Sequence, residues 1–128
     1  MACATRGTGN SDANNLLFGN AGVASTLVAG SGVDALYVTG TAGTILSGGT
    51  GHDTFAFPDV MGHDEVTNFG FTKDTLQFNA SLFSNFTAAM NAASQSGANT
   101  VFTIDANNTV MLDNIAKTSL TASNFHFT

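Results

Sequence analysis

The nonapeptide Gly48-Gly49-Thr50-Gly51-His52-Asp53-Thr54-Phe55-Ala56 decides how this chain folds. The same pattern occurs 19 residues earlier as Ala29-Gly30-Ser31-Gly32-Val33-Asp34-Ala35-Leu36-Tyr37, which lacks only the first glycine. In each copy a glycine-rich turn, where a side chain would clash, leads through an aspartate into a short strand with one large apolar residue at its centre. Two copies at a fixed distance indicate a repeating structural unit.

The repeat extends beyond these two copies with the same period of 19 residues. Residues of one chemical type share a register in three columns: Asn15, Asp34 and Asp53; Leu17, Leu36 and Phe55; Leu27 and Leu46. Each period divides into two halves of about nine or ten residues, so two turns and two strands make one coil. One coil cannot bury its own apolar face, so coils must stack as parallel strands with covered ends. The pattern predicts a short parallel β-roll over residues 10–58.

The second half of the chain has a different pattern. Residues 64–69 and 74–78 alternate polar and apolar side chains as strands do, and residues 101–104 and 109–112 flank a polar turn, which predicts a hairpin. Residues 81–93 have helical spacing, with Asn79 or Ser81 as the candidate cap. We expect the aromatic residues of this half to be core residues: Phe69, Phe71, Phe78, Phe83 and Phe86.

These patterns predict a mainly β protein, in which an α+β cap over residues 59–128 covers the end of the roll and packs with it as one unit. Residues 1–9 contain the single cysteine, Cys3, and no pattern. We expect them to be disordered or left over from cloning.

Composition excludes several classes of function. Nine acidic and three basic residues give a formal charge of −6, and nucleic acid and anionic membranes are bound through Lys and Arg. We expect no membrane insertion, because no run of about 18 apolar residues occurs. One cysteine excludes an internal disulfide and a zinc site built from several thiolates. No H-E-x-x-H, G-x-S-x-G or P-loop motif is present, so we expect no enzymatic activity.

The nonapeptide matches the G-G-x-G-x-D-x-U-x calcium-binding repeat, and the chain thereby resembles RTX (hemolysin-type) proteins. From residue 10 onward it is similar to the C-terminal region of serralysin-type secreted proteins, a likeness carried also by residues 62–69, 74–76 and 119–127. The resemblance implies Ca²⁺ as the ligand and export from a bacterium by type I secretion machinery that reads the C-terminal segment. It also implies folding in the extracellular medium.

Calcium takes six to eight oxygen ligands, many of them backbone carbonyls, and two stacked turns surround an ion where one cannot. By resemblance, the first turn would contribute the carbonyls of Gly30 and Gly32 with the carboxylate of Asp34. The next turn would contribute the carbonyls of Gly48 and Thr50 with the carboxylate of Asp53. The alternative is that both aspartates merely cap tight turns by bonding to backbone N–H groups.

Two further metal sites are weaker hypotheses. One would pair Asn15 with Asp34, although Ser11 and Ala13 stand where glycines are expected. The other would use Asp64 on the opposite side of the roll, helped by Asp59 or Asp74.

The sequence therefore predicts a non-catalytic calcium-binding module that folds after secretion and caps or stabilises a secreted protein, with a fused or upstream catalytic or adhesive domain as its partner. Two alternatives stay open. One is an adhesin or surface-layer element that exposes Val28, Tyr37 and Val38, and the other is the C-terminal fragment of a secreted hydrolase or protease. An ice- or glycan-binding row is disfavoured by the irregular spacing of its threonines: Thr26, Thr39, Thr41 and Thr44.

Overall fold

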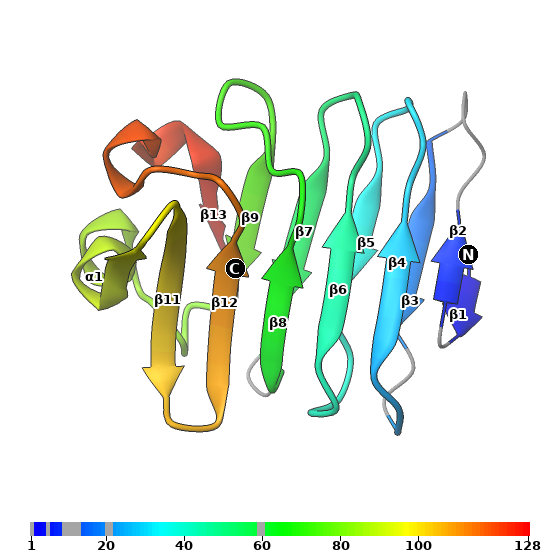
Figure 1. Cartoon of the computed structure of the whole chain (residues 1–128), viewed down its shortest axis with the longest axis horizontal. Helices are drawn as coiled ribbons and strands as arrows, with labels where there is room; N and C mark the ends of the chain where they lie inside the picture. Colours follow the sequence, from blue (N-terminus) through cyan, green and yellow to red (C-terminus); the bar gives the residue numbers. More distant parts are fainter. Residues whose placement is uncertain (1, 5, 9–13, 20–21, 59–60) are drawn as a thin grey trace.

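The computed structural model describes residues 2–4, 6–8, 14–19, 22–58 and 61–128, which form a mainly β protein (Figure 1). Its strands are β1 (Ala2–Ala4), β2 (Arg6–Thr8), β3 (Leu16–Gly19), β4 (Ser25–Val28), β5 (Ala35–Tyr37), β6 (Thr44–Ser47), β7 (Thr54–Phe57), β8 (His63–Val66), β9 (Thr75–Phe78), β10 (Ala93–Ser96), β11 (Asn99–Asp105), β12 (Asn108–Leu112) and β13 (Phe125–Phe127). The helical elements are α1 (Phe86–Ala92) and the 3-10 turns η1 (Lys117–Ser119) and η2 (Ala122–Asn124). Within these ranges, no helix is long and apolar enough to cross a membrane.

The chain passes back and forth between two sheets, which lie one behind the other in Figure 1. One sheet has the order β1-β3-β5-β7-β9-β13 and the other β10-β11-β12-β8-β6-β4-β2. Strands of successive coils pair in parallel, and Leu17 pairs with Leu36, Leu36 with Phe55, and Phe55 with Leu76. The register predicted from the first two of these pairs is confirmed, and it continues into β9.

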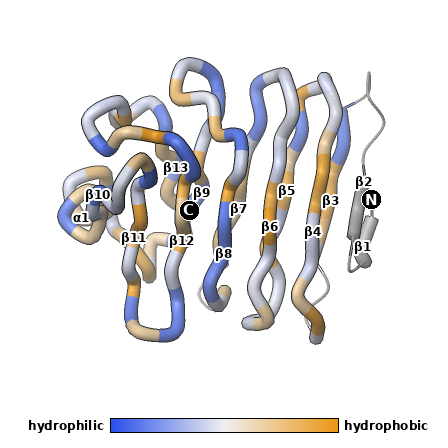
Figure 2. Tube along the Cα trace, in the orientation of Figure 1, coloured by the Kyte–Doolittle hydropathy of each residue, from blue (hydrophilic) through white to orange (hydrophobic). Residues whose placement is uncertain are grey.

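The core lies between the two sheets. Inward-facing apolar residues of β3 to β9 contribute to it: Leu17, Leu27, Leu36, Leu46, Phe55, Val66 and Leu76. Figure 2 shows apolar colour along strands such as β4 and β6. The same cluster of buried residues extends to Phe125, so both halves of the chain share one core. The predicted aromatic core is confirmed for Phe69, Phe78 and Phe83, whereas Phe71 is 47% exposed because it lies in the turn before β9.

Residues 2–4 and 6–8, expected to be disordered or left over from cloning, form β1 and β2. These strands pair in parallel with β3 and β4. Ladder hydrogen bonds use only backbone groups, so a segment without an apolar pattern can still extend a sheet.

The C-terminal half completes both sheets at the end opposite β1 and β2 (Figure 1). β12 pairs in parallel with β8, and β13 pairs in parallel with β9. β11 and β12 form the predicted hairpin, and β10 pairs antiparallel with β11. Pairing of segments far apart in the sequence therefore continues the stack.

Helix α1 begins later than the spacing of apolar residues predicts. Asn79 accepts a hydrogen bond from the N–H of Ser81 in a turn, and the helix is capped instead by Asn85, whose Oδ1 accepts from the N–H of Ala88 at 2.8 Å. The apolar residues before Asn85 have helical spacing because they pack on the core, not because they form a helix.

We expect Asn85→Ala to lower the free energy of unfolding by about 1 kcal/mol, because it removes the side-chain acceptor for the N–H of Ala88. Asn91→Ala, an exposed substitution in the same helix, is the matched control and should leave stability unchanged or slightly raised. Urea denaturation of both variants checks this, and equal effects would contradict the assignment of the cap.

Candidate metal centre

A column of polar side chains precedes the strands of one sheet and forms what we term the acidic ladder: Asn15, Asp34, Asp53 and Asp74. Oδ1 of Asp34 accepts from the N–H of Asn15 at 2.7 Å, and Oδ1 of Asp53 accepts from the N–H of Asp34 at 3.0 Å. Oδ1 of Asp74 accepts from the N–H of Asp53 at 2.9 Å. Each carboxylate thus bonds to the coil before it, and these hydrogen bonds tie successive coils together.

Asp74 belongs to this ladder and not to the site of Asp64, where the sequence analysis suggested a supporting role. Its Oδ2 accepts from the N–H of Gly70 at 2.8 Å, so both carboxylate oxygens of Asp74 have partners. The loop before Asp74 is longer than its counterparts, so Asp53 and Asp74 are 21 residues apart where Asp34 and Asp53 are 19 apart.

The other carboxylate oxygens of the ladder differ from those of Asp74. Oδ2 of Asp34 and Oδ2 of Asp53 are buried and have no hydrogen-bond partner. The two side chains are only 2% and 1% exposed. A buried charged oxygen without a partner is costly, and proteins compensate such groups with an opposite charge or a metal ion. These oxygens are the strongest structural indication of a cation.

Burial and mutual repulsion disfavour the ionised form of the carboxylates in the acidic ladder. Burial and, to a smaller extent, the nearby charges of Asp74 and Asp34 together raise the pKa of Asp53 to about 6, against the lowering effect of the hydrogen bond from the N–H of Asp34. Burial also raises the pKa of Asp74. Protonation would relieve this repulsion, and so would a bound cation.

Backbone oxygens of the first glycine-rich turn point toward the second. A Cβ on Gly49 would overlap the carbonyl oxygen of Gly30, and a Cβ on Gly51 would overlap that of Gly32. A Cβ on Gly48 would overlap Oδ2 of Asp53. The glycines of residues 48–51 thus leave room for oxygens that face the space between the two turns. Hard oxygen donors of this kind suit calcium.

Thr50 lies where the sequence places it, in the second turn, but its N–H donates to the carbonyl of Gly30 at 3.2 Å. One lone pair of that carbonyl is therefore engaged, and the other remains for a further partner. The structure brings together the turns of Gly30, Gly32 and Asp34 and of Gly48, Thr50 and Asp53. It also shows that Oδ1 of each aspartate accepts from a backbone N–H of the neighbouring coil, so the backbone-capping alternative accounts for Oδ1 and leaves Oδ2 without a partner.

Amide side chains bond on both sides of the interval between the turns of Asp34 and Asp53. Nδ2 of Asn15 donates to Oδ1 of Asp34 at 2.8 Å. On the other side Oδ1 of Asn68 accepts from the N–H of Gly48 at 2.8 Å, and its Nδ2 donates to the carbonyl of Gly49 at 3.2 Å. The space between the turns of Asp34 and Asp53 therefore lies between the hydrogen bonds of Asn15 and those of Asn68. Ser11 and Ala13, part of the weaker hypothesis at Asn15, lie outside the described residues.

Asn124 is a residue of this region that sequence reasoning missed. It is buried, and its Nδ2 donates to the carbonyls of Phe71 and Asp74 at 2.8 and 3.1 Å, while its Oδ1 accepts from the N–H of Thr121. The contact spans 50 residues, so only a capping-box pattern at residues 121–124 could have indicated that Asn124 is structural.

Asp64 lies at the opposite turns of the stack, where Gly43 and Gly62 also lie. Its Oδ1 accepts from the N–H of Thr44 at 2.8 Å, and its Oδ2 is buried without a partner. Burial raises its pKa to about 7. A Cβ on Gly62 would overlap the carbonyl oxygen of Thr41, so a backbone oxygen again faces a glycine of the next turn. Asp59, the second proposed helper, lies outside the described residues.

The donor set fits calcium better than zinc or catalysis. Nowhere in the described ranges do three or more His, Cys, Asp or Glu side chains gather in a way that could hold a metal. A metal at the ladder would need backbone carbonyls beside two carboxylates, which is calcium chemistry. The three histidines are exposed, and none joins the ladder: His52, His63 and His126.

In buffer that contains a chelator, we expect stability to fall as the pH rises from about 4 to 8. Asp53 and Asp64 have pKa values raised from 3.8 to about 6 and 7, so over that window the folded chain binds more protons than the unfolded chain. The stabilisation is complete below pH 4 and is lost as the pH passes through these values, on the order of 1 kcal/mol per carboxylate after screening. Melting temperatures at several pH values in EDTA check this, and a rising profile would contradict it.

No protein-family model and no curated protein matches this chain.

Proposed function

We propose that this chain is a non-catalytic calcium-binding module of the RTX type, built as a short parallel β-roll with an α+β cap. The observation that carries the proposal is a pair of buried carboxylate oxygens in adjacent coils, Oδ2 of Asp34 and Oδ2 of Asp53. Neither has a hydrogen-bond partner. The backbone carbonyls of Gly30 and Gly32, which face the glycines of the second turn, support it.

In this proposal a calcium ion supplies the positive charge that the acidic ladder lacks. Asp34 and Asp53 would hold it with backbone oxygens of the two turns: Gly30, Gly32, Gly48 and Thr50. Asp64, whose Oδ2 is also buried without a partner, would hold a second ion at the opposite turns. The glycines allow the turns to approach closely, and the hydrogen bonds that Oδ1 accepts from backbone N–H groups position each carboxylate.

The biological role follows from the low calcium of a bacterial cytoplasm and the roughly millimolar calcium outside. Without the ion, repulsion within the ladder and the backbone entropy of glycine-rich turns favour the unfolded chain, which type I secretion machinery exports. Outside the cell, binding free energy becomes folding free energy. The folded module then caps or stabilises the secreted protein to which it is joined.

Isothermal titration with calcium, with circular dichroism in calcium and in EDTA, tests the proposal. We expect saturable binding with a dissociation constant on the order of 10⁻⁴–10⁻³ M and a gain of β structure with calcium. Asp34→Asn should weaken binding, and Asp105→Asn is the matched control, because Asp105 is exposed at the end of β11. No heat of binding together with identical spectra would refute the proposal.

The alternative of an adhesin or surface-layer element loses part of the patch on which it was based. Val38 is 2% exposed, and Val28 and Tyr37 are half-buried. Val38 follows the last residue of β5 and joins the core, where its side chain is covered. The expectation that these three residues form an exposed apolar patch is therefore wrong.

A further inference from the structure

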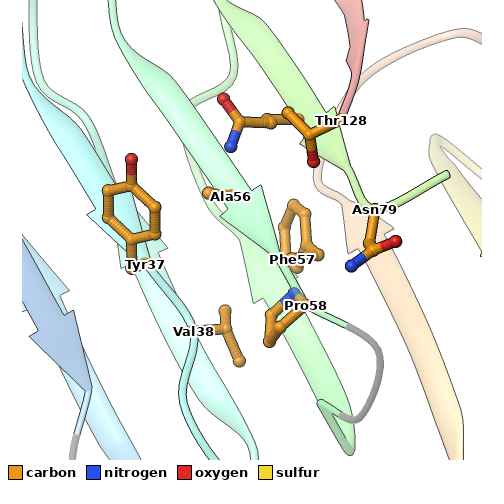
Figure 3. A pocket seen from close by; sticks show the side chains of 8 residues that line it. Tyr37, Val38, Ala56, Phe57, Pro58, Asn79 and Thr128 are labelled. Atoms are coloured by element: carbon orange, nitrogen blue, oxygen red, sulfur yellow. The ribbon is translucent and has the colours of Figure 1, made fainter. Parts of the chain in front are cut away.

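A hollow lies on the outer face of the sheet formed by the odd-numbered strands, over β5, β7 and β9 (Figure 3). Its volume is about 170 Å³, well below the roughly 300–1,000 Å³ of pockets for drug-sized ligands. A ligand of one small ring would fill it. None of the residues that line it carries an acidic or basic side chain: Tyr37, Val38, Ala56, Phe57, Pro58, Gln77, Asn79 and Thr128.

The strand register explains why the hollow exists. Tyr37, Ala56 and Gln77 are directly paired neighbours across β5, β7 and β9. The small side chain of Ala56 between two long ones leaves a gap in this row, and Figure 3 shows Tyr37 and Ala56 side by side there. The Tyr37 ring is held in place by stacking on Phe18, with ring centroids 5.0 Å apart and planes 20° from parallel. The hollow therefore has a fixed aromatic wall.

Polar groups around the hollow are free to bind a ligand. Among the described residues, the hydroxyl of Tyr37 and the side-chain amide of Gln77 have no hydrogen-bond partner. Asn79 uses its Oδ1 to accept from the N–H of Ser81, which leaves its Nδ2 available. Pro58, which is exposed, adds apolar surface. An aromatic wall, apolar contacts and neutral hydrogen-bonding groups match a sugar ring, which has apolar C–H faces and hydroxyls at its edge.

We propose that this hollow is a subsite for a neutral monosaccharide unit. The side chains of Gln77 and Asn79 and the hydroxyl of Tyr37 bind its hydroxyl groups, and Ala56 forms the floor. A charged sugar is disfavoured, because no lining side chain offers a counter-charge. The hollow lies toward the ends of β5, β7 and β9, whereas the acidic ladder precedes their first residues, so the proposal does not depend on the calcium site.

NMR titration of the ¹⁵N-labelled protein in calcium tests the subsite, with glucose, galactose, mannose and N-acetylglucosamine as probes. We expect at least one sugar to shift the amide signals of residues 56–58 and 77–79 with a dissociation constant on the order of 1–20 mM. Ala56→Val fills the hollow and should weaken binding about tenfold, and Gln77→Ala removes a hydrogen-bonding group and should weaken it several-fold.

Thr54→Val is the matched control, because Thr54 lies on the same outer face of β7 two residues earlier and does not line the hollow. It should bind as the unsubstituted protein does. Absence of shifts with all four sugars at 50 mM would overturn the proposal. Equal binding by Ala56→Val, Gln77→Ala and Thr54→Val would overturn it as well, as would shifts confined to other surfaces. None of these outcomes bears on calcium binding.

Discussion

Asp53→Asn is expected to destabilise the protein in calcium and to stabilise it in a chelator. The amide keeps Oδ1, which accepts from the N–H of Asp34, and it removes the charge on the buried Oδ2. A purely structural hydrogen bond would respond to this substitution in the same way under both conditions. The reversal of sign therefore separates a metal ligand from a structural residue.

The magnitudes follow from linkage. With calcium at about 100 times its dissociation constant, binding adds about 2.7 kcal/mol to stability, and a variant that cannot bind loses most of this. For a chain of this size that is a fall in melting temperature of roughly 8–12 °C. In EDTA at pH 7.5, the raised pKa of Asp53 means that its ionised form destabilises the fold, so removal of the charge should raise the melting temperature by roughly 3–5 °C.

Thermal unfolding followed by circular dichroism in 10 mM calcium and in EDTA measures both effects. Asp105→Asn, which removes an exposed acid outside the ladder, should show no reversal. If Asp53→Asn lowers stability by the same amount in calcium and in EDTA, Asp53 is structural and no ion binds beside it.

Gly49→Ala is expected to lower the free energy of unfolding by about 2–5 kcal/mol. Gly49 has a φ of +83°, which costs an L-residue about 1–2 kcal/mol. Its Cβ would also overlap the carbonyl oxygen of Gly30, a backbone atom that moves only if the two turns separate. Forced separation of packed groups costs about 1–3 kcal/mol more. The expected fall in melting temperature is roughly 6–20 °C.

Gly97→Ala is the control for this prediction, because Gly97 also has a positive φ, of +60°, but a Cβ there would meet nothing within 4 Å. It should cost about 1 kcal/mol, the backbone part alone. Urea denaturation in calcium measures both variants. Equal losses would mean that the close approach of the two turns contributes nothing to stability.

Much of the fold could be predicted because a stacked repeat places equivalent residues in equivalent environments. The spacing of Leu17, Leu36 and Phe55 predicted which residues are buried and which strands pair. The hairpin of residues 101–112 could be predicted as well, because a polar turn between two alternating segments is a local signal. Helix α1 was predicted with the wrong start, because residues that pack on the core through a turn can imitate helical spacing.

The sequence predicted which residues form the candidate site, but it did not predict their hydrogen bonds. The repeat placed Asp34 and Asp53 in one column, but nothing in the spacing showed that each Oδ1 bonds to the preceding coil and leaves Oδ2 buried and unpaired. Asp74 was assigned to the wrong side, because a longer loop changes the spacing while the strand ladder keeps the register. Asn124 reaches the same turn from 50 residues away.

The amino-acid sequence by itself determined the period, the inward apolar positions and the glycine-aspartate turns, since each of these depends on residues close together in the chain. Only the tertiary structure decided which carboxylate oxygens lack a partner and where the hollow beside Ala56 lies. Those features depend on side chains of neighbouring coils and of the C-terminal half, whose positions are set by backbone hydrogen bonds between strands and not by distance along the chain.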